Sequence, residues 1–152
     1  MSKTNLEPES IATFRRKARE IALQVLFQRE FVSDVDVMVS LDYFRGNVTA
    51  SAATWAYAET LLNGVIKNKA EIDGALSEKS KSWKIERMSP VDLSIMRVAT
   101  FEILFGRAEA PPKAAINEAV EIAKRYGGND SSAFINGILD AVLTDSLKHE
   151  PS

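Results

Sequence analysis

Three arginines near the start of the chain carry the clearest chemical signal in this sequence. Arg15, Arg16 and Arg19 fall within an arc of about 100° on a helix, because each residue turns the helix by roughly 100°. Guanidinium groups bind phosphate through two donors at once and stack on flat rings. The apolar positions of the same helix lie beside this arc, so we expect all three side chains on an exposed flank. The spacing is compatible with a phosphate-binding patch, although three arginines on a helix are also typical of a solvated face.

Flat side chains that could stack on bases are the second signal. Sequence-specific recognition of unpaired nucleotides needs stacking rings and polar groups as well as positive charge. Phe27 and Phe134 are the candidates. Both also stand at the spacing of core residues, so packing into the core is the alternative for each.

Two charged residues lie in the middle of a segment that is apolar nearly all round. Arg97 and Glu102 lie within residues 90–105, and a charge on such a helix must be paired or must emerge at an edge. They are five residues apart, about 140° around a helix, so we expect them not to pair with each other. Each forms either a structural ion pair or part of an exposed polar surface. Asp130 is a further candidate, with a plain alternative role as a helix cap.

Catalytic and metal sites find little support in the sequence. The chain has no cysteine and a single histidine, His149, near its end. A lone histidine without a partner does not make a metal cluster, and no phosphate-binding glycine loop follows a strand. We therefore predict that the protein is not an enzyme and needs no metal or cofactor.

Size and composition are those of one ordinary domain. The chain has 152 residues, 45% of them hydrophobic and 26% charged, with a formal net charge of −2. A nucleic-acid site must therefore come from local clustering of positive charge. The polar N-terminus is no secretory signal, and no apolar run reaches the roughly 20 residues that span a bilayer. Together with the absence of cysteine, these features predict a cytoplasmic protein that does not bind membranes.

Helical spacing of apolar residues runs along most of the chain, and no segment has the alternation of a strand. Residues 90–105 are apolar nearly all round, which predicts a buried central helix. Gly64 and Gly74 are expected to bend or break the longest helix. The predicted helices cover residues 11–31, 35–44, 51–77, 90–105 and 112–126, with a last helix ending near Leu147.

The chain also divides into two helical halves. A polar link near residues 77–84 marks the division, and the polar ends are expected to be disordered. The predicted segments are an arm over residues 1–10, an N-terminal half over about 11–77, a C-terminal half over about 83–147 and a polar tail over 148–152.

Three glycines of the C-terminal half are expected at the end or in the interior of a helix. Gly127 and Gly128 can take the left-handed conformation that ends a helix, and Asn129 or Asp130 can cap the next one. Gly137 lies inside the last helix, where glycine costs about 1 kcal/mol relative to alanine. A glycine at that position predicts another backbone packed close to it.

Three blocks of the sequence match one known family in order and spacing. They are FRRKAREIALQVLFQ, SPVDLSIMRVATFEIL and AINEAVEIAKRYGGNDSSAFINGILD. They resemble the arginine-rich first helix, the central helix and the C-terminal signature of the NusB family, the bacterial transcription antitermination factors. Residues 31–80 match only in helical pattern. The resemblance implies an all-α domain of about seven helices, arranged as two small packed bundles.

The same resemblance implies a function and a set of site residues. It implies binding of single-stranded boxA-type RNA in transcripts of ribosomal RNA operons, together with NusE, a small-subunit ribosomal protein. NusA, NusG and RNA polymerase complete the implied antitermination complex, and some members of the family pair with themselves. The positions carried over as RNA contacts are Arg15, Arg16, Arg19, Phe27, Arg97, Glu102, Asp130 and Phe134.

Some of these positions depart from a simple RNA-binding pattern. Phe27 stands where the family usually has tyrosine, so it can stack on a base but cannot donate a hydrogen bond. The carboxylate of Asp130 would repel phosphates and lower the affinity. Ala133 stands where the family often has a polar or basic residue, which removes one auxiliary contact.

Two other functions are compatible with the sequence. NusB-like domains also serve as RNA-targeting domains of ribosomal RNA cytosine methyltransferases. A helical protein-interaction module without RNA binding, in which the arginines face a partner protein, is the second alternative.

Overall fold

The structure is a computed structural model that describes residues 10–32, 34–81, 84–128 and 130–149. Over these ranges the chain forms seven α-helices and one short 3₁₀ helix and has no strand, so the prediction of an all-α fold is confirmed. The predicted arm, up to residue 9, and the end of the tail lie outside the described residues, as does Asn129. The elements are α1 (Ile11–Arg29), α2 (Val37–Asn47), α3 (Ala52–Lys67), α4 (Lys69–Ser80), η2 (Ile85–Arg87), α5 (Pro90–Phe105), α6 (Pro112–Tyr126) and α7 (Ser131–Lys148).

Short polar side chains fix where four of the helices begin. The hydroxyls of Ser10, Ser51 and Ser89 each accept a hydrogen bond at 3.1 Å from the backbone N–H three residues later. Asp36 caps α2 by accepting from the second N–H along. These bonds satisfy N–H groups that have no partner within a helix. Pro90 follows Ser89 at the first helical position, as predicted.

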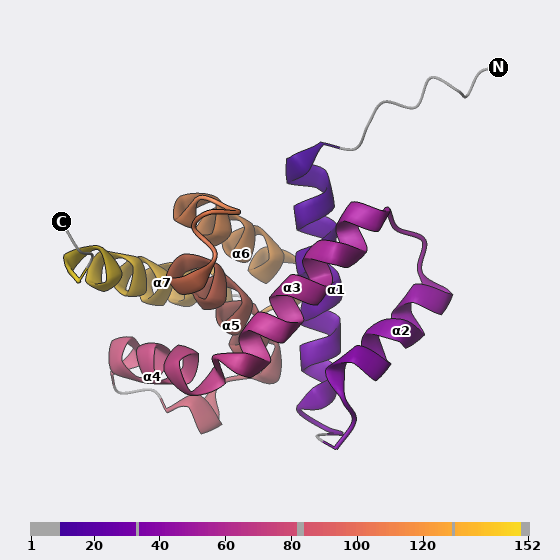
Figure 1. Cartoon of the computed structure of the whole chain (residues 1–152). Coiled ribbons are helices and arrows are strands. Elements are labelled where there is room, and N and C mark those ends of the chain that lie inside the picture. The colour runs from indigo at the N-terminus through magenta and orange to yellow at the C-terminus, as the bar shows by residue number, and fades with distance from the viewer. Residues whose placement is uncertain (1–9, 33, 82–83, 129, 150–152) are drawn as a thin grey trace.

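The helix α5 lies at the centre of the molecule (Figure 1). Every residue from Leu93 to Ile103 is buried, which confirms the prediction of a buried central helix. α1 and α3 pack against α5 on one side, α6 and α7 pack against it on another, and α4 contacts both α5 and α7. This arrangement brings side chains of α1 and α6 together beside α5, although the two helices lie far apart in the sequence.

A buried ion pair joins α1 to this central helix. Arg19 Nε and Nη2 donate to the two carboxylate oxygens of Glu102, each at 2.8 Å. Arg19 is 5% exposed and Glu102 is 0% exposed. Tyr57 of α3 donates its hydroxyl to Glu102 Oε2 at 2.5 Å, and burial together with this carboxylate raises the pKa of Tyr57. One carboxylate thus connects α1, α3 and α5.

The longest predicted helix is broken, but neither glycine breaks it. α3 ends at Lys67 and α4 begins at Lys69, and between them the backbone of Asn68 leaves the helical conformation, with φ −108° and ψ 21°. The Asn68 side chain donates to Gly64 O at 2.9 Å and so completes the end of α3. Gly64 instead allows α3 to approach α5, because a Cβ there would lie 2.1 Å from the ring of Phe101.

The remaining glycine predictions need correction. Gly127 has φ −94° and ψ 177°, an extended conformation, and none of the described glycines has positive φ. Gly127 is required for space, because a Cβ would lie 2.7 Å from the Ser131 Cβ. No heavy atom lies within 4 Å of a Cβ built on Gly137, so no backbone is packed against it. Asp130 precedes α7 but its side chain makes no capping bond. The Ser131 hydroxyl accepts from Gly128 N instead, at 3.0 Å.

Replacing Glu102 with glutamine tests the buried ion pair. Glu102→Gln leaves the Arg19 charge buried without a carboxylate, so we expect the free energy of unfolding to fall by about 3 kcal/mol. Urea denaturation followed by circular dichroism measures the change. Glu121→Gln, on the exposed face of α6, is the matched control and should change the stability by less than about 0.5 kcal/mol. A loss below about 1 kcal/mol in Glu102→Gln would contradict the structural role of the pair.

Two helix-interior glycines give a paired test of the contact between α3 and α5. In Gly64→Ala the added methyl group collides with the Phe101 ring, and we expect a loss of about 1–2 kcal/mol in stability. In Gly74→Ala the methyl group meets no atom within 4 Å, so helix propensity should raise the stability by about 0.5–1 kcal/mol. Thermal or urea unfolding of both variants measures the difference. Equal stabilisation by both substitutions would show that α3 does not need glycine at position 64.

Candidate nucleic-acid interface

The three arginines of α1 point in three directions rather than forming one exposed patch. Arg19 turns inward to Glu102, so the prediction that it lies on an exposed flank is wrong. The sequence pattern could not reveal this, because its partner stands 83 residues away on α5. Arg19 positions α1 in the fold and presents no free guanidinium to a ligand.

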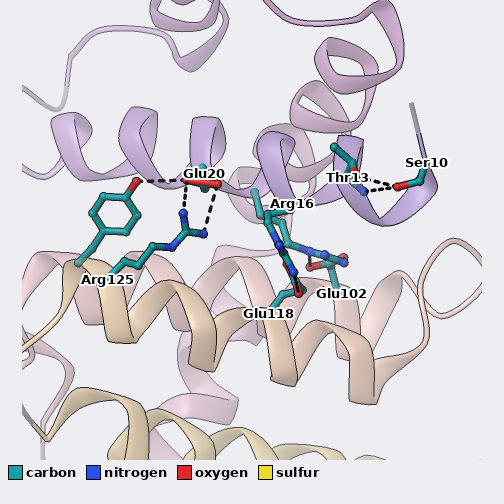
Figure 2. Close-up of polar contacts among 9 residues, drawn as sticks. Ser10, Thr13, Arg16, Glu20, Glu102, Glu118 and Arg125 are labelled. Atoms are coloured by element: carbon teal, nitrogen blue, oxygen red, sulfur yellow. Dashed lines mark hydrogen bonds and ion pairs between the residues drawn. The ribbon is translucent and has the colours of Figure 1, made fainter. Parts of the chain in front are cut away.

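The side chain of Arg16 extends from α1 toward α6, where it pairs with Glu118. Its Nε donates to Glu118 Oε1 at 2.8 Å and its Nη2 donates to Oε2 at 2.9 Å. Figure 2 shows Arg16 reaching Glu118. The Arg16 side chain is 52% exposed, so solvent reaches the guanidinium. Of the three predicted arginines, Arg16 therefore has the geometry and the access that contact with a phosphate requires.

Arg15 lies on the opposite flank of α1, toward α3. Its guanidinium carbon is 5.3 Å from the centre of the Tyr57 ring and 5.8 Å from that of Phe14, distances typical of cation–π contacts. Its Nε is buried and makes no hydrogen bond within the described part of the chain. Arg15 and Arg16 therefore face different sides of α1.

Arg97 also forms a structural ion pair. Its Nε and Nη2 each donate to an oxygen of Asp73 at 2.9 Å, and its Nη1 donates to Glu30 at 3.1 Å. Arg97 is 6% exposed, and its pairing connects α5 to α4 and to the end of α1. Arg97 and Glu102 do not pair with each other, as predicted. Both side chains are buried, so each forms a structural ion pair and neither belongs to an exposed polar surface.

The contact between α1 and α6 continues beyond Arg16 through a second set of charges. Glu20 accepts from Arg125 at 3.4 Å and from the Tyr126 hydroxyl at 3.1 Å. Figure 2 shows α1 running beside α6, with Arg16 reaching Glu118 and Arg125 reaching Glu20. We call this row of paired charges, Arg16–Glu118 and Glu20–Arg125, the α1–α6 seam. Its two exposed guanidiniums are balanced by two carboxylates.

An apolar groove lies at the end of this seam. It has a volume of about 460 Å³ and opens to solvent. Phe27, half-buried, and Tyr126, 46% exposed, contribute rings to it. The exposed side chains of Gln24 and Gln28 supply amide donors and acceptors. The remaining lining residues are Leu23, Phe44 and Val91.

Sequence reasoning found Phe27 but missed Tyr126, Gln24 and Gln28. Gln24, Phe27 and Gln28 follow the i, i+3, i+4 spacing of a single helix face, which could have indicated them. Tyr126 ends α6 immediately before the two glycines, and only the packing of α6 beside α1 brings it to the groove.

The remaining predicted residues lie at the start of α7. Asp130 is exposed, and Phe134 is half-buried and packs against the core. Ser131 donates to Asp92 of α5 at 3.0 Å and so fixes the position of this turn. Neither Asp130 nor Phe134 lines the groove that Phe27 enters.

Other kinds of site find no support in the described part of the chain. Among these residues no group of three or more histidine, cysteine, aspartate or glutamate side chains could hold a metal ion. His149 is predicted to lack a partner, but its imidazole Nδ1 lies 2.9 Å from the backbone oxygen of Asp145, one turn earlier in the chain. Within the same ranges, no helix combines the length and apolarity needed to cross a membrane.

Comparison with known proteins identifies one family. The model of the NusB family matches residues 16–144. The transcription antitermination protein NusB of Bdellovibrio bacteriovorus is 45% identical over 130 residues, which cover 86% of this chain and 95% of that protein. The protein of the same name from Geotalea uraniireducens is 45% identical over 141 residues, covering 86% of this chain and 94% of that protein.

Solved structures agree with the sequence comparisons. NusB of T. maritima superposes with a TM-score of 0.77 at 34% identity, covering 86% of this chain and 91% of that one. A chain in the crystal structure of antitermination factors NusB and NusE in complex with dsRNA has the same fold, with a TM-score of 0.77, 20% identity and coverage of 87% and 97%. The family match over most of the chain and the relatives at 45% identity lead to one conclusion: the chain belongs to the NusB family of transcription antitermination proteins, a non-enzymatic family.

Proposed function

We propose that the chain binds an unpaired RNA segment of boxA type in ribosomal RNA transcripts and, with NusE, promotes antitermination. In this proposal it acts in the cytoplasm, in a complex with NusA, NusG and RNA polymerase. The RNA strand lies along the α1–α6 seam and enters the apolar groove.

One observation carries this proposal, namely that a row of exposed guanidiniums leads directly to two stacking rings. Arg16 and Arg125 both lie on the seam, and Tyr126 follows Arg125 in the sequence and donates to the same Glu20. Arginine binds phosphate through two donors, whereas unpaired bases bind by stacking on aromatic side chains. Phe27 and Tyr126 offer those rings in a groove whose amide groups can form hydrogen bonds with base edges. Duplex RNA keeps its bases stacked, so the groove favours a single strand.

The other predicted RNA contacts take different parts in this proposal. Asp130 and Phe134, at the start of α7, contribute secondary contacts where the strand leaves the groove. Arg15 lies on the opposite flank of α1, against Tyr57, so in this proposal it stays off the path of the strand. Arg19, Arg97 and Glu102 are buried, so they support the site by fixing α1 and α5 and do not contact the strand. A substitution at Arg19 would therefore confuse loss of binding with loss of folding.

The protein partner is proposed by analogy with relatives. A solved NusB of the same fold was crystallised with NusE and dsRNA. A second basic protein would enlarge the positive surface, since the seam itself has no excess charge. Self-pairing of the free chain stays a prediction, as does the division of the fold near residues 77–84.

The two alternative functions gain less support. Relatives named as antitermination proteins match this chain over 94–95% of their own length, which favours the antitermination factor over a methyltransferase domain. The groove with its two rings and two amides favours RNA over a purely protein-binding surface. Mixing the protein with boxA-type RNA, with and without NusE, tests this choice directly.

Replacing Arg16 tests the phosphate contact. We expect Arg16→Ala to weaken binding of a labelled single-stranded boxA RNA by roughly tenfold, because a hydrogen-bonded charge contact is lost. It should also make the plot of log affinity against log salt shallower, by at most about 0.7. Fluorescence anisotropy at several salt concentrations measures both. Arg45→Ala removes an exposed arginine on α2 that pairs with Asp42 and Glu59, and it should leave the affinity within about twofold. Equal effects of the two substitutions would exclude the seam as the binding site.

Replacing the two rings tests the groove. Phe27→Leu and Tyr126→Leu keep the groove apolar but remove stacking, so each should weaken RNA binding by roughly five- to hundredfold. The same RNA annealed to its complement should bind more weakly than the single strand to the unsubstituted chain. Tyr43→Leu, which removes a ring that is 66% exposed on α2, is the control and should leave the affinity unchanged. Stronger binding of the duplex would mean that stacking in the groove does not drive recognition.

A further inference from the structure

The ion pair on Arg16 has the geometry of a phosphate contact, although its partner is a carboxylate. Both oxygens of Glu118 accept from the guanidinium, one from Nε at 2.8 Å and one from Nη2 at 2.9 Å. A phosphate bound by arginine uses the same two parallel hydrogen bonds. Glu118 therefore already fills the position on Arg16 that the strand would need.

The charge on Glu118 is permanent at neutral pH. Hydrogen bonds from Arg16 lower the pKa of Glu118, against the opposing effect of burial, and the charges of Arg19 and Arg125 act in the same direction as Arg16. Arg19 already has Glu102 as its partner, and Arg125 has Glu20. Each guanidinium beside Glu118 is thus neutralised before any RNA arrives.

The two arginine–glutamate pairs of α1 differ in whether they can open. Arg19–Glu102 is buried, with side chains 5% and 1% exposed, so separating it would leave uncompensated charges in the core. In the pair Arg16–Glu118 the Arg16 side chain is 52% exposed and the Glu118 side chain is 17% exposed, so a ligand can reach the guanidinium and water screens part of the attraction. Arg16 can therefore change partners without disturbing the fold.

We propose that Glu118 is an internal competitor for the RNA phosphate. On this proposal, which rests on the proposed function of the seam, Arg16 releases Glu118 when a phosphate of the strand binds. Glu118 thereby lowers the affinity and the salt dependence of binding, and it limits the protein to strands whose bases also stack in the groove.

A positioning role for Glu118 makes the opposite prediction. If the carboxylate held Arg16 in the orientation that meets the strand, its removal would weaken binding. The sign of the change in affinity therefore distinguishes a competitor from a positioning residue.

The test measures binding of a fluorescein-labelled single-stranded boxA RNA to the full chain by anisotropy over a range of KCl concentrations. We expect Glu118→Gln to tighten binding by roughly three- to tenfold. The salt slope should become steeper by up to about 0.7, because Arg16 then neutralises a phosphate without competition. Combined with Arg16→Ala, the Glu118→Gln substitution should give no gain, since the competitor acts only through Arg16.

Glu121→Gln is the matched control. It removes the same charge from the same helix, but among the described residues the salt-bridge partner of Glu121 is the exposed Lys124 and not an arginine of the seam, so the affinity should change by less than about twofold. Thermal unfolding of each variant should stay close to that of the unsubstituted chain, because in both pairs the cation is exposed to solvent and its attraction is screened.

The outcomes separate this inference from the function on which it rests. If the unsubstituted chain does not bind the RNA, the proposed function is overturned, and the competitor role with it. If the chain binds and Arg16→Ala weakens binding, while Glu118→Gln leaves the affinity unchanged or lowers it, only the competitor role is overturned. A gain equal to that of Glu121→Gln, or a gain that persists without Arg16, overturns it as well.

Discussion

The buried pair between Arg19 and Glu102 fixes how α1 is rotated against the rest of the molecule. A guanidinium and a carboxylate can be buried only when their hydrogen bonds are satisfied, and here two bonds of 2.8 Å and the Tyr57 hydroxyl satisfy Glu102. Once Arg19 faces α5, the positions of its neighbours on the helix follow. Arg15 is directed toward α3 and Arg16 toward α6, so a sequence cluster of arginines becomes three separate contacts.

The same ion-pair chemistry serves two purposes in this fold, and burial decides between them. The pair of Arg19 is enclosed by the core, and the guanidinium of Arg97 is buried beneath its partly exposed carboxylates. Both arginines connect helices. The pairs along the α1–α6 seam lie at the surface, where water and salt weaken the attraction. A surface of paired charges has little net field to attract a polyanion. Recognition at such a surface depends on exchange of partners and on stacking, which favours a ligand that supplies both phosphates and unpaired bases.

Local signals predicted most of the helices. Serine followed by proline marked the start of α5, continuous apolar character marked its burial, and helical spacing marked α1, α6 and α7. The errors concern packing. The break at Asn68 depends on a side-chain bond to the preceding turn, Gly64 is required by a ring from another helix, and Gly137 lies in open space. None of these contacts can be read from residue types alone, because each depends on which element lies opposite.

The sequence by itself determined the family, the all-helical fold and the residue types that are available for RNA binding. These follow from motifs and periodicity, which are properties of short segments. The tertiary structure alone decided which arginine reaches solvent, because the partners of Arg19 and Arg16 lie 83 and 102 residues away. It also brought Tyr126 and Phe27 to one groove, from helices that lie far apart in the sequence. The charge of an arginine is fixed by its chemistry, but its availability depends on the carboxylates that the fold places against it.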